Sequence, residues 1–301
     1  MLPVATLMLS LFFTGCFTGI ETTNKINLSK KDIETVKPSD EDRFLSDIRF
    51  LALKDWKPEK PFLITDDKFS ILVEGPGRAM LHKGDTIFFK TSEIAKSAGG
   101  GESTRIIFDT RYGETSYPIE KDIMSASNSI AASDIALTID LEIVNTVREK
   151  LKGQTVWTRS ALWYDDSLNY KKGKKFLKVN INEVKPGNSF FPLLVEFSDE
   201  DNEKGSFLMN VGFSGNESRN FGKLFSLTDP KDNYKNISAE NWSAIQSEKL
   251  NPGMTKEECR LSRGNPTDVD NGHNYSNTME IWFYPDGSYL QFVDGLLVNF
   301  K

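Results

Sequence analysis

The acidic residues offer the first candidate for catalytic chemistry. Asp165 and Asp166 are adjacent, and hydrolysis of a glycosidic bond uses a pair of carboxylates. Successive side chains on a strand point to opposite faces, so this pair would fit poorly around one shared substrate. A hydrolase acting on glycan or peptide through these two carboxylates is therefore an alternative hypothesis rather than the preferred one.

Other residue types that could do chemistry lack the usual surroundings. The stretch 212–215 (Gly-Phe-Ser-Gly) does not have the glycine spacing of a nucleophile elbow. His82 and His273 are the only histidines, which argues against zinc hydrolysis and histidine-based acid–base catalysis. Cys259 follows two glutamates, which predicts a buried structural thiol, and the acidic run 199–203 predicts a solvated hairpin turn rather than a calcium site. We therefore predict no catalytic residue, no metal and no cofactor.

Cys16 carries the most informative chemistry in the chain. It follows an uncharged, apolar stretch, residues 1–15, which is too short to span a bilayer and is typical of a signal peptide. Leu11-Phe12-Phe13-Thr14-Gly15-Cys16 resembles the lipobox of bacterial lipoproteins, although no Lys or Arg precedes the run. The resemblance implies cleavage before Cys16, attachment of lipid to its thiol, and anchoring of the protein in the cell envelope. Phe17 stands where an aspartate can retain such proteins in the inner membrane, so the resemblance favours the outer membrane.

Composition limits the range of partners. The chain has 301 residues, of which 38% are hydrophobic, and a formal net charge of −6 without a basic block, which argues against nucleic acid as a partner. Only two cysteines are present, so acylation of Cys16 would leave Cys259 without a disulfide partner. Stability must then come from packing.

The pattern of apolar residues predicts an α+β, β-rich protein with two small β-barrel-like modules before a C-terminal domain. Short β-type runs, including 62–64, 69–73, 86–89 and 105–108, alternate with turn clusters, and a helical pattern covers residues 123–150. We expect these segments: a signal peptide (1–15), a lipidated tether with a short helix (16–60), a first β module with a helical connection (61–150), a second β module (151–235) and the C-terminal domain (236–301).

The upstream β region shows one further similarity. Lys83-Gly84-Asp85 and Arg111-Tyr112-Gly113 resemble segments of bacterial Src-homology-3-like domains. The resemblance implies small barrels that bind other molecules.

The C-terminal domain has the clearest local signals. Ser238 is placed to cap one helix, and Thr255 with Glu258 has the spacing of a capping box at the start of a second. Gly264 and Pro266 would end that second helix. Runs 278–284, 288–292 and 296–300, separated by turns, then predict a three-stranded antiparallel sheet.

Four motifs in this domain occur in the order of a known family. They are Gly253-Met254-Thr255-Lys256-Glu257-Glu258, Gly264-Asn265-Pro266, Trp282-Phe283-Tyr284 and Tyr289-Leu290-Gln291-Phe292. They resemble the SmpA/OmlA (BamE-like) family, which implies two helices on a three-stranded sheet and a role in outer-membrane assembly or envelope maintenance. The same small fold also resembles β-lactamase-inhibitor proteins, which leaves an inhibitor that binds a soluble enzyme as a further alternative.

Strand periodicity selects a candidate binding surface. Trp282 and Tyr284 share one face of their strand and Phe283 takes the other, so one face packs on the helices and one is available. Trp282 and Tyr284 are the predicted protein-binding face. The preferred hypothesis is a non-catalytic, lipid-anchored envelope protein that binds another protein, with peptidoglycan as an alternative ligand.

Overall fold

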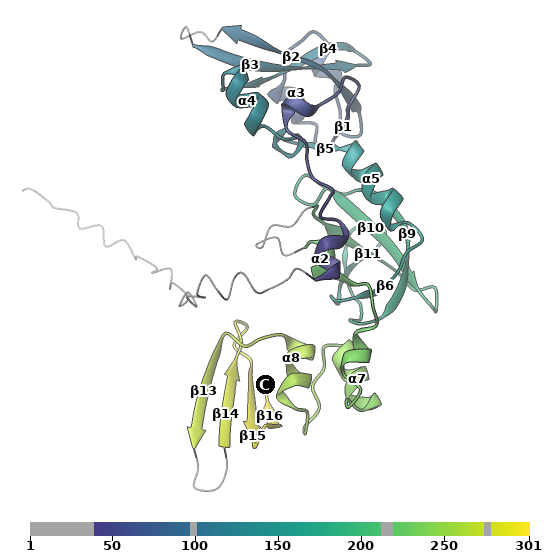
Figure 1. The fold of residues 1–301 in the computed structure, drawn as a ribbon, viewed down its shortest axis with the longest axis vertical. Helices are drawn as coiled ribbons and strands as arrows, with labels where there is room; N and C mark the ends of the chain where they lie inside the picture. Colours follow the sequence, from purple (N-terminus) through teal and green to yellow (C-terminus); the bar gives the residue numbers. More distant parts are fainter. Residues whose placement is uncertain (1–38, 97–100, 212–218, 274–277) are drawn as a thin grey trace, which may run out of the picture. The chain divides into compact units, whose positions relative to one another are not determined.

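The computed structural model describes residues 39–96, 101–211, 219–273 and 278–301 (Figure 1). This part of the chain is α+β and sheet-rich, with seven α-helices and three antiparallel sheets, one of which curls into a half-barrel. The signal peptide and Cys16 lie outside the described residues.

The first sheet has five strands in the order β4-β3-β2-β1-β5. The strand β1, which lies between β2 and β5, alternates half-buried and buried residues, and Phe62 and Ile64 point into the core. The strands are β1 (Pro61–Ile64), β2 (Thr86–Lys96), β3 (Glu102–Thr110), β4 (Gly113–Ile119) and β5 (Thr138–Asp140). The short helices around it are η1 (Leu53–Asp55), α3 (Phe69–Leu72), η2 (Arg78–Met80), α4 (Ile123–Ser129) and η3 (Ala132–Asp134), whereas Phe44 of α2 (Asp40–Phe44) packs against Phe221 in the core of the second sheet.

Residues 69–73, predicted as a strand, instead contain the helix α3. Asp66 starts this turn, because its carboxylate accepts a hydrogen bond from the Lys68 amide and its carbonyl accepts one from the Phe69 amide. Phe69 is buried while Ile71 is 75% exposed. An apolar run that buries only one side of a helical turn looks like a strand in the sequence.

The predicted helical stretch 123–150 is interrupted by β5, and a longer helix, α5 (Leu141–Leu151), begins directly after that strand. Asp140 ends β5 and caps α5, accepting hydrogen bonds from the Glu142 amide at 3.0 Å and the Ile143 amide at 3.4 Å. The buried side of α5 belongs to the core of the second sheet. The helix therefore connects two cores without an intervening loop.

A buried ion pair lies at this connection. The Lys60 ammonium is 2.7 Å from the Asp140 carboxylate and 2.5 Å from that of Glu142. Burial raises the pKa of Asp140 above its ordinary value, although Lys60 and the α5 amides act in the opposite direction. The charges of Lys60 and Asp140 depend on each other, because neither side chain is exposed to water.

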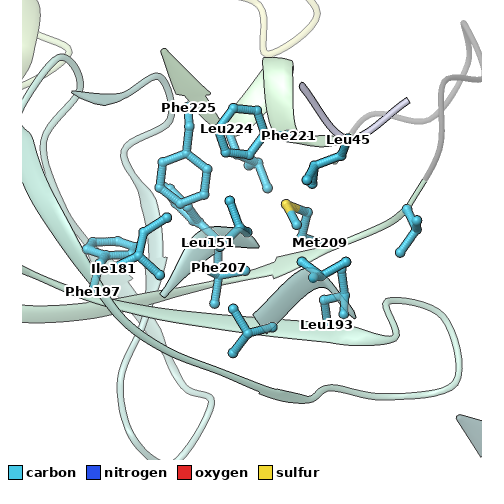
Figure 2. Close-up of a cluster of buried hydrophobic side chains, with 14 of the residues drawn as sticks. Leu45, Leu151, Ile181, Leu193, Phe197, Phe207, Met209, Phe221, Leu224 and Phe225 are labelled. Carbon is cyan, nitrogen blue, oxygen red and sulfur yellow. The ribbon is translucent and has the colours of Figure 1, made fainter. Parts of the chain in front are cut away.

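The second sheet has seven strands in the order β12-β6-β9-β10-β11-β7-β8. They are β6 (Thr155–Thr158), β7 (Leu162–Tyr164), β8 (Tyr170–Lys172), β9 (Lys178–Pro186), β10 (Leu193–Asp199), β11 (Lys204–Met209) and β12 (Phe225–Ser226), with α6 (Phe221–Leu224) before the last strand. Figure 2 shows the apolar side chains that converge in its core, including Leu45, Leu151, Ile181, Leu193, Phe197, Phe207, Met209, Phe221, Leu224 and Phe225.

Trp163 is buried at one end of this core. Its ring fills the space where side chains at Gly173 and Gly205 would stand, since a β-carbon at either glycine would lie less than 3 Å from the indole. Both glycines are thus required by close packing rather than by backbone conformation.

The C-terminal unit contains η4 (Pro230–Asn233), α7 (Ala239–Gln246), α8 (Lys256–Arg263) and a sheet ordered β13-β14-β15-β16. Its strands are β13 (Asp268–His273), β14 (Thr278–Phe283), β15 (Tyr289–Val293) and β16 (Leu296–Phe300). The predicted caps are confirmed: Ser238 accepts from the Asn241 amide, and Thr255 and Glu258 form the capping box.

The expected three-stranded sheet is wrong by one strand, because β13 pairs with β14 along its whole length. The sequence of β13 is rich in Asp, Asn and Gly, which are depleted in strands, so its own residues do not predict it. Pairing with the strongly apolar β14 determines its conformation.

Candidate functional site: the open face of the C-terminal sheet

Trp282 and Tyr284 lie in the core rather than on a surface. Trp282 is 0% exposed and Tyr284 is 8% exposed, and both belong to the cluster formed by α7, α8 and the sheet. The prediction that they form the protein-binding face is therefore corrected. Their strand does present one free face, but it is the face that carries Phe283.

The helix α8 holds Trp282 in place. The Arg260 guanidinium stacks 4.6 Å from the indole centroid, and the indole nitrogen donates to the Glu280 carboxylate, which also pairs with Lys256. Burial raises the pKa of Glu280, but the hydrogen bonds from Lys256 and Trp282 outweigh it and hold the pKa below its ordinary value. The polar atom of the buried indole is thus satisfied within the unit.

Tyr284 is fixed at the other end of the same helix. Its hydroxyl donates to the Gly264 carbonyl at 3.2 Å, just where α8 ends. Burial is the main reason that its pKa is raised to about 12. The hydroxyl therefore stays protonated and serves as a helix-end hydrogen-bond donor.

The opposite face, which we call the open face, follows from the strand register. Residues paired across an antiparallel sheet share a face, and the pairs Phe283–Tyr289, Ile281–Gln291 and Met279–Val293 lie opposite the face of Trp282. The pair Val293–Leu296 extends it to β16. The apolar members of the open face are Met279, Ile281, Phe283, Tyr289, Val293 and Leu296.

None of these apolar residues belongs to the core cluster of the C-terminal unit or to the partly buried residues packed against that cluster. Phe283 is 40% exposed and Leu296 is 47% exposed, while the other four are half-buried. Within the described part of the chain, one sheet face therefore packs on helices, and the other presents contiguous apolar side chains to solvent. Contiguous exposed apolar patches commonly mark interaction sites.

The open face has charge of opposite sign at its two borders. Asp268 pairs with Phe283 and Asp270 with Ile281, so both carboxylates border the face on β13. Lys301 exchanges backbone hydrogen bonds with Tyr289, which places it on the same face beyond β16. The salt bridges among the described residues involve none of these three side chains.

Asp165 and Asp166 do not form a shared carboxylate site. Asp165 closes a turn after β7, where its carboxylate accepts hydrogen bonds from the amides of Ser167 and Asn169. These bonds, the one from Asn169 first, hold its pKa below the ordinary value. Asp166 is exposed beside it. The first carboxylate is used by the loop, which does not favour the hydrolase hypothesis.

The remaining candidates have structural surroundings. Cys259 is buried in α8, and burial is the main cause that raises its pKa to about 12, as expected for a structural thiol. The acidic run 199–203 is a hairpin turn in which Asp199 accepts from the amides of Asp201 and Glu203. His82 lies in a loop near Asp67. Ser214 lies outside the described residues, and the side chain of His273 is not described.

A polar cavity of about 630 Å³ is lined by residues of α2, α8 and the second sheet. Its cations already have partners. Arg159 pairs with Glu41, Lys175 donates to the Ser262 carbonyl at 2.7 Å, and Arg260 stacks on the Trp282 indole. These contacts fix the surrounding segments and leave the open face as the stronger candidate.

Among the described residues no group of three or more His, Cys, Asp and Glu side chains is arranged to hold a metal ion. No helix found there is long and apolar enough to cross a membrane.

Comparison of the chain with protein-family models, curated proteins and solved structures found no match. The geometry of the site is therefore the main guide to function.

Sequence reasoning recognised that one face of β14 is free but selected the wrong one. The alternation of Met279, Ile281 and Phe283 was a usable signal, because it continues as Tyr289 and Val293 on the next strand. What the sequence lacked was the position of α8, which decides which face is covered.

Proposed function

We propose that this protein is a non-catalytic, lipid-anchored component of a bacterial cell envelope that binds another protein through the open face. The lipobox-like segment ending at Cys16 supports the anchor, and the resemblance of the C-terminal motifs to the SmpA/OmlA family supports a role in envelope assembly or maintenance. The observation that carries the binding function is the uncovered apolar sheet face.

The arrangement of the C-terminal unit is suited to this role. The face toward the helices is closed by buried aromatic and aliphatic residues, so Phe283 and its neighbours contribute little to the core. Covering exposed apolar area stabilises an association by about 25 cal/mol per Å², before the costs of association are counted. A surface with this pattern gains most from a partner that is itself apolar.

The proposal also assigns a role to the two upstream sheets. We infer that they are the small barrel-like modules expected from the sequence and that they act as spacers between the lipid and the binding unit. Tight cores, such as the one around Phe197 and Phe207, suit a rigid spacer.

A photo-crosslinking amino acid placed at Phe283 in intact cells tests the binding function. We expect a covalent adduct with a protein. The matched control is Phe190, which is 82% exposed but lies between β9 and β10 of the second sheet and should give no such adduct. Absence of any adduct from Phe283 and from the neighbouring position Ile281 would contradict the proposal.

The lipid anchor has a separate test. Cys16→Ser should move the protein from the membrane fraction to the soluble fraction of cells. Thermal unfolding of the purified variant should match that of the delipidated parent, because the substitution is expected to remove only the lipid. A Cys16→Ser variant that remains in the membrane fraction would overturn the anchor.

A further inference from the structure

The strand register of the C-terminal sheet arranges the open face in rows, two of which begin at a carboxylate on β13. One row runs Asp268, Phe283, Tyr289 and Lys301, from β13 to β16. The next row runs from Asp270 through Ile281 and Gln291 to Asn299. Each row thus has a carboxylate at the β13 border and a hydrogen-bond donor at the β16 border.

We propose that the occupant of the open face is a second copy of this chain, packed sheet against sheet about a two-fold axis parallel to the strands. Such an axis reverses the strand order while it keeps each row over itself. Asp268 of one copy then lies over Lys301 of the other, and Phe283 lies over Tyr289. This inference rests on the proposed function only in using the open face as a docking surface.

Two symmetric face-to-face arrangements are possible, and the charges of Asp268, Asp270 and Lys301 discriminate between them. A two-fold axis perpendicular to the strands would place β13 over β13, so Asp268 and Asp270 would meet the same carboxylates of the second copy. Like charges placed directly opposite each other are unfavourable. The parallel axis avoids this and places Lys301 over Asp268 and Asn299, whose amide also donates to the Tyr289 hydroxyl at 3.3 Å, over Asp270.

The side chains between the borders fit the same arrangement in two rows, while in the row between them Ile281 meets the polar Gln291. Opposite aromatic residues meet across the interface in the first row, and Met279 meets Val293 in the row beyond Gln291. Two sheets that pack face to face stand about 10 Å apart, which leaves room for one layer of interdigitated side chains from each. Aromatic pairs at such distances add about 0.5–1.5 kcal/mol beyond burial.

The area of the open face determines how stable the dimer is expected to be. Four strands about 4.8 Å apart and five residues long give a footprint of about 300 Å², measured as a flat area. A stable interface buries about 800 Å² on each partner. The dimer should therefore be weak in dilute solution and depend on protein concentration.

Charge reversal tests the arrangement. Sedimentation velocity over a wide concentration range, with the full chain carrying Cys16→Ser, should show reversible monomer–dimer exchange. Asp268→Lys and Lys301→Asp should each weaken dimerisation by about tenfold, the effect of losing about 1.4 kcal/mol. The double variant Asp268→Lys/Lys301→Asp should dimerise like the parent, because the pair is restored with its signs exchanged. An equimolar mixture of the two single variants should also associate.

The control is Asp201→Lys, the same charge reversal in the exposed hairpin of the second sheet, which should leave dimerisation unchanged. Equal thermal midpoints for all variants would show that each one folds. A parent chain that stays monomeric throughout, or a double variant that remains as weak as the single ones, overturns the second-copy inference. If the Phe283 crosslinker captures only a different protein, the binding function stands and the inference of a second copy fails.

Discussion

Trp282 and Phe283 are neighbours in β14, yet the indole is completely buried beneath α8 while the phenyl ring is 40% exposed on the opposite face. The first ring therefore belongs to the fold, and the second is the one that we propose contacts a partner. Substitutions at these adjacent positions should separate stability from interaction.

Trp282→Ala should destabilise the C-terminal unit by about 3–5 kcal/mol, because it empties a packed site and leaves Glu280 without the indole donor. Phe283→Ala should change the free energy of unfolding by less than about 1 kcal/mol, since its ring lies outside the core. Urea unfolding measures both. A Phe283→Ala variant as unstable as Trp282→Ala would show that the open face is part of the fold.

Glu280 should make the stability of the C-terminal unit depend on pH. Its pKa in the folded protein lies below the ordinary value of 4.5, so the unfolded chain binds a proton more readily. The stabilisation is present above about pH 4.5 and is lost as the pH falls through the lower folded pKa. Glu280→Gln should be less stable at neutral pH and should lose less stability on acidification. Identical pH profiles for the parent and the variant would contradict this role.

Lys60→Met should cost about 3–5 kcal/mol of stability, because it leaves the Asp140 carboxylate buried without its ammonium partner. Lys60→Met/Asp140→Asn should recover part of that loss, since the asparagine oxygen still caps α5. A double-mutant cycle measured by urea unfolding gives the coupling energy. If the two single effects simply add, the ion pair does not act as a unit.

Cys259 should be unreactive toward disulfide reagents in the folded state. Burial, and the nearby Glu258 carboxylate, raise its thiol pKa to about 12, so almost no thiolate exists at pH 8. In a Cys16→Ser background Cys259 is the only thiol, and its modification should be seen only when urea unfolds the chain. Rapid labelling of the native protein would show that α8 opens far more readily than its packing implies.

Local sequence signals predicted the fold best where contacts within a few residues determine the backbone conformation. Ser238, Thr255 and Glu258 identified both C-terminal helix starts correctly, because a cap is a contact within a few residues. The strand β13 was missed because Asp268 is held by pairing with Phe283, which is distant in sequence. The helix α3 was missed because the local turn at Asp66 that starts it was not recognised beside the apolar run that contains the buried Phe69.

The candidate site could be predicted only in part for the same reason. Period-two alternation places Trp282 and Phe283 on opposite faces, and the structure agrees. Nothing in the strand itself tells which face receives α8. That choice depends on Arg260 and Lys256, which lie on a separate helix and contact only one side of the sheet.

The direct junction of β5 and α5 affects both the proteolysis and the unfolding of the chain. Asp140 is both the last residue of the strand and the cap of the helix, so a protease finds no flexible peptide between the first and second sheets at this point. Limited digestion should release residues on both sides of Asp140 as one fragment. The two sheets should likewise melt in one cooperative step, since loss of either core removes a support of the same backbone segment.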